Sequence, residues 1–78
     1  MPRFFFRYHD QNEVLLDLKG EEHPDLDAAR REARRAASEI HADIISSGGT
    51  VSKQAAFEIT NEAGMLLAWV PILTSLLH

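Results

Sequence analysis

Aromatic and polar residues alternate near the start of the chain. Phe4, Phe6 and Tyr8 fall on one face of an extended segment, and the residues between them fall on the other face. A polar run of turn-forming residues follows, and apolar residues resume at alternate positions from Val14. This pattern predicts a β-hairpin over residues 3–18.

The middle of the chain has the pattern of an amphipathic helix. Glycine, proline and charged residues fill positions 19–24, which predicts an exposed connection without a strand. Asp25 follows directly, and we expect its carboxylate to accept hydrogen bonds from the free amides of the first helical turn. Apolar residues then recur at spacings of three and four. They are Leu26, Ala29, Ala33, Ala36, Ile40 and Ile44. Because Gly48 and Gly49 suit a helix C-terminus, we predict a helix over residues 25–47.

A second alternating segment follows the helix. It begins near Phe57, and the run Asn61-Glu62-Ala63-Gly64 provides a turn before further apolar residues, which predicts a hairpin over residues 56–70. Pro71 has no backbone N–H donor, so we expect it to break the strand ladder and leave an apolar tail over residues 71–78. The order strand, strand, helix, strand, strand belongs to the α+β class, with one amphipathic helix packed on an antiparallel-dominated sheet.

Length and charge narrow the classes of function. The chain has 78 residues, which is room for one domain over residues 1–78, and it contains no cysteine. Its stability must therefore come from packing within the chain or between chains. Eight Lys and Arg against twelve Asp and Glu give a net charge of −4, which argues against nucleic acid and anionic membranes as partners. The apolar runs are too short for a signal-peptide core or a membrane span, so we expect a cytoplasmic protein.

Three segments of the chain carry a resemblance to a known family. They are Met1-Pro2-Arg3-Phe4-Phe5-Phe6, the helix entry Gly20-Glu21-Glu22-His23-Pro24-Asp25-Leu26, and Phe57-Glu58-Ile59-Thr60-Asn61-Glu62-Ala63-Gly64. In their order and spacing they resemble a family of small bacterial proteins classed only as a domain of unknown function. The resemblance covers nearly the whole chain, but the tail after Pro71 is more apolar than the family implies. It brings no catalytic residue, ligand or cofactor.

Four arginines offer a candidate nucleic-acid surface on the helix face opposite the apolar stripe. They are Arg30, Arg31, Arg34 and Arg35. Carboxylates lie at in-helix pairing distance, because Asp27 comes four residues before Arg31 and Glu39 comes four after Arg35. Glu32 sits among the arginines. We therefore expect a solvated, self-neutralised face, and a small regulatory protein that contacts nucleic acid is the alternative function.

Candidate catalytic and metal-binding residues are scattered along the chain. The histidines are His9, His23, His41 and His78. They lack the fixed local spacing that makes a metal site recognisable. The glycine pair follows the helix, whereas a phosphate-binding loop precedes one. We expect no enzymatic activity, no metal and no cofactor, and a zinc site shared between chains or a metal-dependent enzyme is the weakest alternative.

One helix covers only one face of a sheet, so the alternation leaves large apolar side chains on the other face. Along the strands these are Phe5, Leu15, Leu67 and Trp69. Ile72, Leu73 and Leu76 of the tail complete the candidate interface. A second copy of the chain and the chain's own residues 72–77 are equally supported as the cover, and a different protein partner comes third. We expect a non-enzymatic module of unknown biological role that forms a homodimer.

Overall fold

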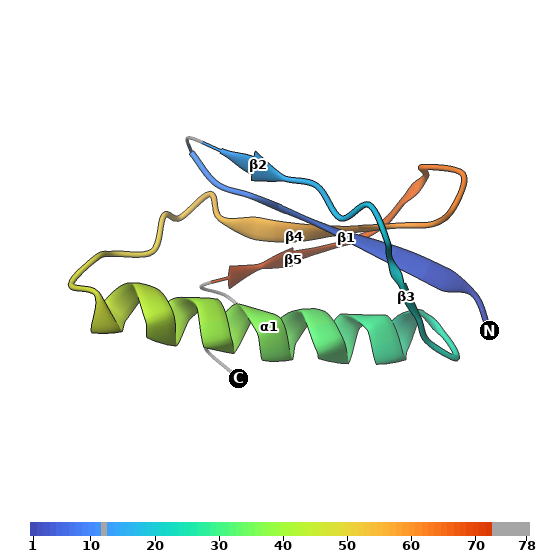
Figure 1. The fold of residues 1–78 in the computed structure, drawn as a ribbon, viewed down its shortest axis with the longest axis horizontal. Coiled ribbons are helices and arrows are strands. Elements are labelled where there is room, and N and C mark those ends of the chain that lie inside the picture. The colour runs from blue at the N-terminus through green and yellow to red at the C-terminus, as the bar shows by residue number, and fades with distance from the viewer. Residues whose placement is uncertain (12, 73–78) are drawn as a thin grey trace.

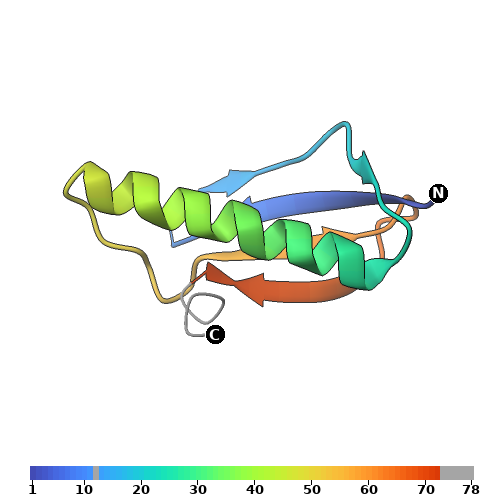
Figure 2. The ribbon, with the colours of Figure 1, turned by 90° about the horizontal axis from the view of Figure 1, so that it is seen from below.

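The computed structural model describes residues 1–11 and 13–72, and the elements within these ranges are one long helix and a five-stranded antiparallel sheet (Figure 1). The elements in chain order are β1 (Arg3–His9), β2 (Val14–Leu15), β3 (Glu21–Glu22), α1 (Leu26–Ser46), β4 (Ala56–Thr60) and β5 (Leu66–Pro71). The strand order is β2-β1-β4-β5, and β3 also pairs with β1. Figure 2 shows β2 and β3 on the same side of β1. The predicted α+β class is confirmed.

The core lies between α1 and one face of the sheet. Ala29, Ala33 and Ala37 are fully buried and follow one another at intervals of one helical turn. Such small side chains let the helix backbone approach the strands closely. The buried residues that complete this core from the rest of the chain are Phe4, Tyr8, Ala55, Phe57, Ile59, Val70 and Ile72. The alternation in β1 and β4 therefore sorts side chains between core and surface as the sequence predicts.

Both ends of α1 have local causes. The Asp25 side chain accepts a hydrogen bond from the backbone N–H of Ala28 at 2.9 Å, so it is the N-cap that the sequence predicts. At the other end the backbone N–H of Gly49 donates to the carbonyl of Ile44 at 2.9 Å. Gly48, the residue before Gly49, has a φ of 82°, a left-handed conformation that glycine adopts at little cost.

Two short strands, β2 and β3, form the edge of the sheet beside β1, and Asp17 lies between them. Its carboxylate accepts a hydrogen bond from the backbone N–H of Phe6 at 3.1 Å, in the gap between β2 and β3. The same carboxylate accepts from the N–H groups of Lys19 at 3.1 Å and Gly20 at 2.9 Å. Burial raises the pKa of Asp17, but these hydrogen bonds and nearby Arg3 outweigh it and hold the pKa below its usual value. The charged Asp17 side chain therefore accepts a hydrogen bond from β1 that a strand backbone would otherwise accept.

At this edge the predicted hairpin is present but shorter than expected, and the prediction of a connection without a strand is wrong. The hairpin expected over residues 3–18 pairs only along the two residues of β2, and the connection expected over residues 19–24 contains β3. Gly20 is the reason for the second difference, because its φ of 71° turns the chain back toward β1. Glu22 then lies opposite Arg3, and their side chains form an ion pair at 3.1 Å.

The C-terminal prediction also needs correction. Pro71 does not end the ladder early, because β5 includes it and pairs it with Ala56. An edge strand tolerates proline, which lacks only a donor. Ile72 continues the pairing, donating its N–H to the carbonyl of Ala55 at 2.9 Å, and its side chain is fully buried in the core. Ile72 is therefore a core residue and not part of a surface interface, whereas Leu73 and Leu76 lie outside the described residues.

Candidate interface on the open sheet face

The face of the sheet that points away from α1 combines apolar and charged side chains, and we call it the open face. Strand pairing arranges these side chains in rows, because residues opposite each other point to the same side of a sheet. One row runs from Arg7 of β1 through Glu58 of β4 to Trp69 of β5. The open face comprises Phe5, Arg7, His9, Ala56, Glu58, Thr60, Leu66, Trp69 and Pro71.

Three apolar side chains of the open face are in contact with solvent. Leu66 and Trp69 on β5 are each 53% exposed, and Phe5 on β1 is partly exposed. The sequence predicts Phe5 and Trp69 on this face, and both lie there. An indole ring this exposed is unusual for an isolated surface position and typical of a contact between proteins.

Two other predicted members of this face lie on the helix side. Leu15 pairs with the core residue Tyr8, so it points to the same side as α1. Leu67 packs against the core, whereas Leu66 is exposed opposite Thr60. A register shift beside Thr60 causes this exchange, because one extra residue in a strand reverses the faces that follow it.

A polar network crosses the centre of the open face. Arg7 donates from Nε to Glu58 Oε1 at 2.8 Å, and its Nη2 atom lies 2.6 Å from the same oxygen. His9 Nε2 lies 3.8 Å from that oxygen and accepts a hydrogen bond from Trp69 Nε1 at 3.4 Å. Side chains from three strands are thus connected, and the network holds the edge of the indole toward β1. Alternation places Arg7 and His9 on this face, but only the pairing of β1 with β4 brings Glu58 to them.

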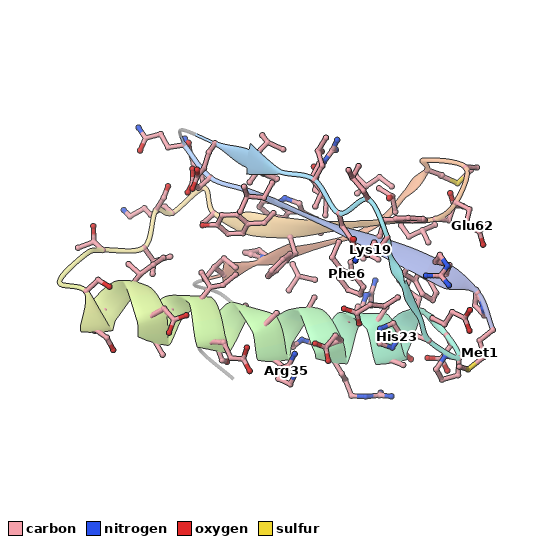
Figure 3. All side chains as sticks on the ribbon, viewed as in Figure 1. Met1, Phe6, Lys19, His23, Arg35 and Glu62 are labelled. Atoms are coloured by element: carbon pink, nitrogen blue, oxygen red, sulfur yellow. The ribbon has the colours of Figure 1, made fainter. Side chains whose placement is uncertain are left out.

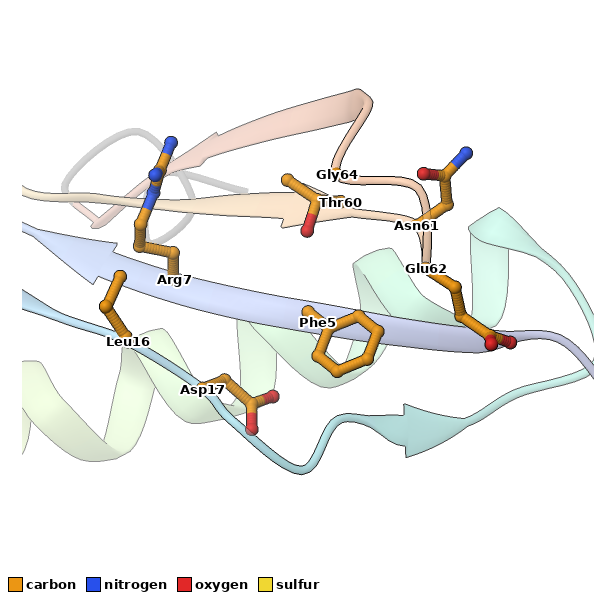
Figure 4. Close-up of a pocket in the computed structure, with 8 residues that line it drawn as sticks. All are labelled: Phe5, Arg7, Leu16, Asp17, Thr60, Asn61, Glu62 and Gly64. Atoms are coloured by element: carbon orange, nitrogen blue, oxygen red, sulfur yellow. The ribbon is translucent and has the colours of Figure 1, made fainter.

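A hollow of about 290 Å³ lies beside this network, between β1, the segment after β2 and the turn that joins β4 to β5 (Figure 4). Phe5 and Arg7 line it from β1, and Asn61 and Gly64 line it from the turn. The Asn61 side chain accepts from two backbone N–H groups of its own turn, at 2.9 and 3.0 Å. The turn that forms one wall of the hollow is therefore fixed by local hydrogen bonds, and Phe5 contributes an aromatic ring to the lining.

A family model described as "Domain of unknown function (DUF6894)" matches residues 3–74 of the chain. The chain belongs to this family. The match confirms the resemblance to a family of unknown function that the three sequence segments indicate. No curated protein and no solved structure matches the chain. The family description names no activity.

The arginine face of this DUF6894 domain is only partly neutralised. Arg35, labelled in Figure 3 on the side of α1 away from the sheet, forms ion pairs with Glu32 and Glu39. The hydrogen bond from Arg35 lowers the pKa of Glu32. Among the described residues Arg30, Arg31 and Arg34 form no ion pair, so the expectation of a self-neutralised face is wrong for them. Exposed pairs gain too little to hold such long side chains in one geometry.

The described histidines do not form a metal site. His23 packs its ring against Phe4 and Phe6, with ring centroids 6.2 and 5.8 Å apart, and Figure 3 shows it beside Phe6. His9 belongs to the open face. In the part of the chain that the structure describes, no three metal-ligating side chains gather. The described helix also lacks the apolar length needed to cross a membrane.

Proposed function

We propose that the DUF6894 chain is a non-enzymatic module that forms a homodimer through its open face. The observation that carries this proposal is the half-exposed Trp69, which lies with Leu66 on a sheet face that α1 does not cover. A chain of 78 residues has a thin core and gains much from burying such a surface. At the centre of this face Arg7 and His9 both lie beside the Glu58 carboxylate, and this arrangement suits binding better than proton transfer.

The charges of the open face support a second copy as the partner. A two-fold symmetric interface places the same patch on both subunits, so the patch must complement itself. Arg7 and Glu58 lie side by side at its centre, one of each sign. When a second copy approaches with its two-fold axis between these two residues and perpendicular to the line that joins them, each guanidinium faces the carboxylate of the other subunit. The apolar rings beside the pair then exclude water from these contacts.

Charge exchange provides the experiment. In Glu58→Arg, two arginines meet two arginines across the proposed interface, so dimerisation should weaken by about tenfold or more. The double variant Arg7→Glu with Glu58→Arg restores one charge of each sign and should recover most of the affinity. Sedimentation equilibrium at micromolar concentrations measures the mass of each protein. A wild-type chain that keeps the monomer mass of 8.8 kDa throughout would overturn the proposal.

A second candidate function, contact with nucleic acid, is favoured by the unpaired arginines of α1. Arg31 and Arg34 are exposed and, among the described residues, form no ion pair. If they contact phosphates, binding to a short DNA duplex should fall steeply with salt, and Arg31→Gln with Arg34→Gln should lower the salt slope by about 2. Arg35→Gln is the matched control, because Arg35 already pairs with carboxylates. No binding at low salt would exclude this function.

A further inference from the structure

A groove runs along the helix side of the sheet, next to the half that α1 covers. Four strands spaced about 4.8 Å apart are wider than one helix of about 10 Å diameter. α1 packs on β4 and β5, and Figure 2 shows β2 lying to one side of it. The space between α1 and β2, which we call the lateral groove, has a volume of about 590 Å³.

The walls and floor of the lateral groove are apolar. The apolar side chains that form them are Phe6, Tyr8, Leu15, Leu16, Ile40, Ile44 and Phe57. Leu15 is 56% exposed although it points to the same side as the core residue Tyr8. Ile40 and Ile44 come from the last two turns of α1, so helix and sheet each contribute one wall. The lateral groove therefore continues the apolar core beyond the part of the sheet that α1 covers.

Among the described residues that line the lateral groove, the charged ones are all acidic: Asp10, Glu13 and Asp17. Asp17 is held ionised by its backbone hydrogen bonds. Asp10 Oδ2 accepts from the Tyr8 hydroxyl at 3.2 Å, and burial together with this neighbour raises the pKa of Tyr8. Glu13 is exposed and forms no ion pair with another described residue. The described rim therefore carries negative charge and attracts cations.

We infer that the lateral groove binds an amphipathic helix with basic side chains, supplied by a different protein. Its apolar stripe would lie on Leu15, Ile40 and Ile44, with its axis parallel or antiparallel to α1, as in packed helices whose axes are about 8–10 Å apart. Lysines or arginines at the edges of the stripe would face the acidic rim. A second copy fits this site poorly, because Ala29, Ala33 and Ala37 of the apolar stripe on its α1 are buried under its own sheet. The inference uses a surface separate from the open face and does not rest on dimerisation.

The test uses a synthetic peptide of about 14 residues, composed of leucine and lysine with the leucines on one helical face, which spans about 21 Å. Fluorescence anisotropy should detect saturable binding of this peptide to the full chain. The corresponding peptide of leucine and glutamate should bind about tenfold more weakly or worse. Absence of binding by the lysine peptide, or equal binding of both peptides, would overturn the inference.

Two variants of equal charge locate the binding site. Leu15→Lys puts a cation into the lateral groove and should weaken peptide binding by about tenfold. Leu66→Lys makes the same change in net charge on the open face. The two leucines are exposed to nearly the same extent, Leu66 to 53% and Leu15 to 56%. Leu66→Lys should leave peptide affinity unchanged while weakening dimerisation. Equal loss in both variants would mean that the peptide responds only to the overall charge, and the inference would fail.

Discussion

Replacing Gly20 with alanine is expected to lower the free energy of unfolding by about 3 kcal/mol, the largest effect on stability among the substitutions considered. Gly20 has a φ of 71°, where a residue with a Cβ atom loses about 1–2 kcal/mol. A Cβ atom would also lie 2.9 Å from the carbonyl oxygen of Phe4 and 2.9 Å from Phe5 Cε2. Because one of these neighbours is backbone, the segment that contains β3 would have to move off β1.

Gly48→Ala is the matched control for this prediction. Gly48 has a φ of 82°, but a Cβ atom there would meet nothing within 4 Å. This variant should therefore lose only the conformational cost of about 1–2 kcal/mol. Urea denaturation at one protein concentration gives both free energies, and fixing the concentration keeps any dimerisation constant. Equal losses in the two variants would show that close packing of the chain over Gly20 does not contribute.

Replacing Trp69 with alanine is expected to weaken dimerisation by about 2 kcal/mol or more, which is about thirtyfold in the dissociation constant. The indole is 53% exposed in the single chain, so burying it in an interface removes a large apolar area from water. Its N–H group already donates to His9 Nε2 at 3.4 Å, which fixes the ring before association. A rigid aromatic side chain loses little conformational freedom on binding, and this is why tryptophan is a frequent anchor.

Leu18→Ala serves as the control for the Trp69 substitution. Leu18 is 86% exposed and lies in the segment between β2 and β3, outside the open face. Its removal should leave the dissociation constant of the dimer unchanged. Sedimentation equilibrium measures both variants, and thermal unfolding checks that each remains folded. If Trp69→Ala changes neither the mass measured by sedimentation nor the midpoint of thermal unfolding, the indole contributes neither to a dimer interface nor to the stability of the fold.

The sequence predicts those parts of the fold that depend on neighbouring residues. Asp25 before a run of helix formers places the start of α1, and alternation places Phe5 and Trp69 on the face away from it. These signals are local, since a cap or a period of two needs no knowledge of the strand partner. For the same reason the resemblance to a family of unknown function could be established from three short segments.

The predictions that fail depend on pairing between distant segments. Leu15 lies on the helix side because β2 pairs in the register that puts it opposite Tyr8, and nothing in the polar turn fixes that register. Leu67 changes face because of a register shift inside the second hairpin. The edge beside β1 is completed by Asp17, whose carboxylate reaches the N–H of Phe6 across the gap between two short strands. The hydrophobic periodicity of the sequence does not predict such a contact between a side chain and the backbone of a distant strand.

The candidate site shows the same division. Trp69 and Arg7 could be assigned to one face from alternation, but their connection through Glu58 and His9 required the three-strand register. The lateral groove was not predicted because it follows from the position of α1 over β4 and β5. A helix sequence specifies which of its faces is buried but not which strands it covers.

The fluorescence of Trp69 tests the central claim most directly, because the chain contains a single tryptophan and it lies on the open face. Emission spectra and acrylamide quenching are recorded across the concentration range in which sedimentation shows the mass doubling. Dimerisation through the open face predicts that the emission maximum moves to shorter wavelength and that quenching falls as the dimer forms. A mass that doubles while emission and quenching stay constant would place the dimer contact elsewhere and contradict the proposed function.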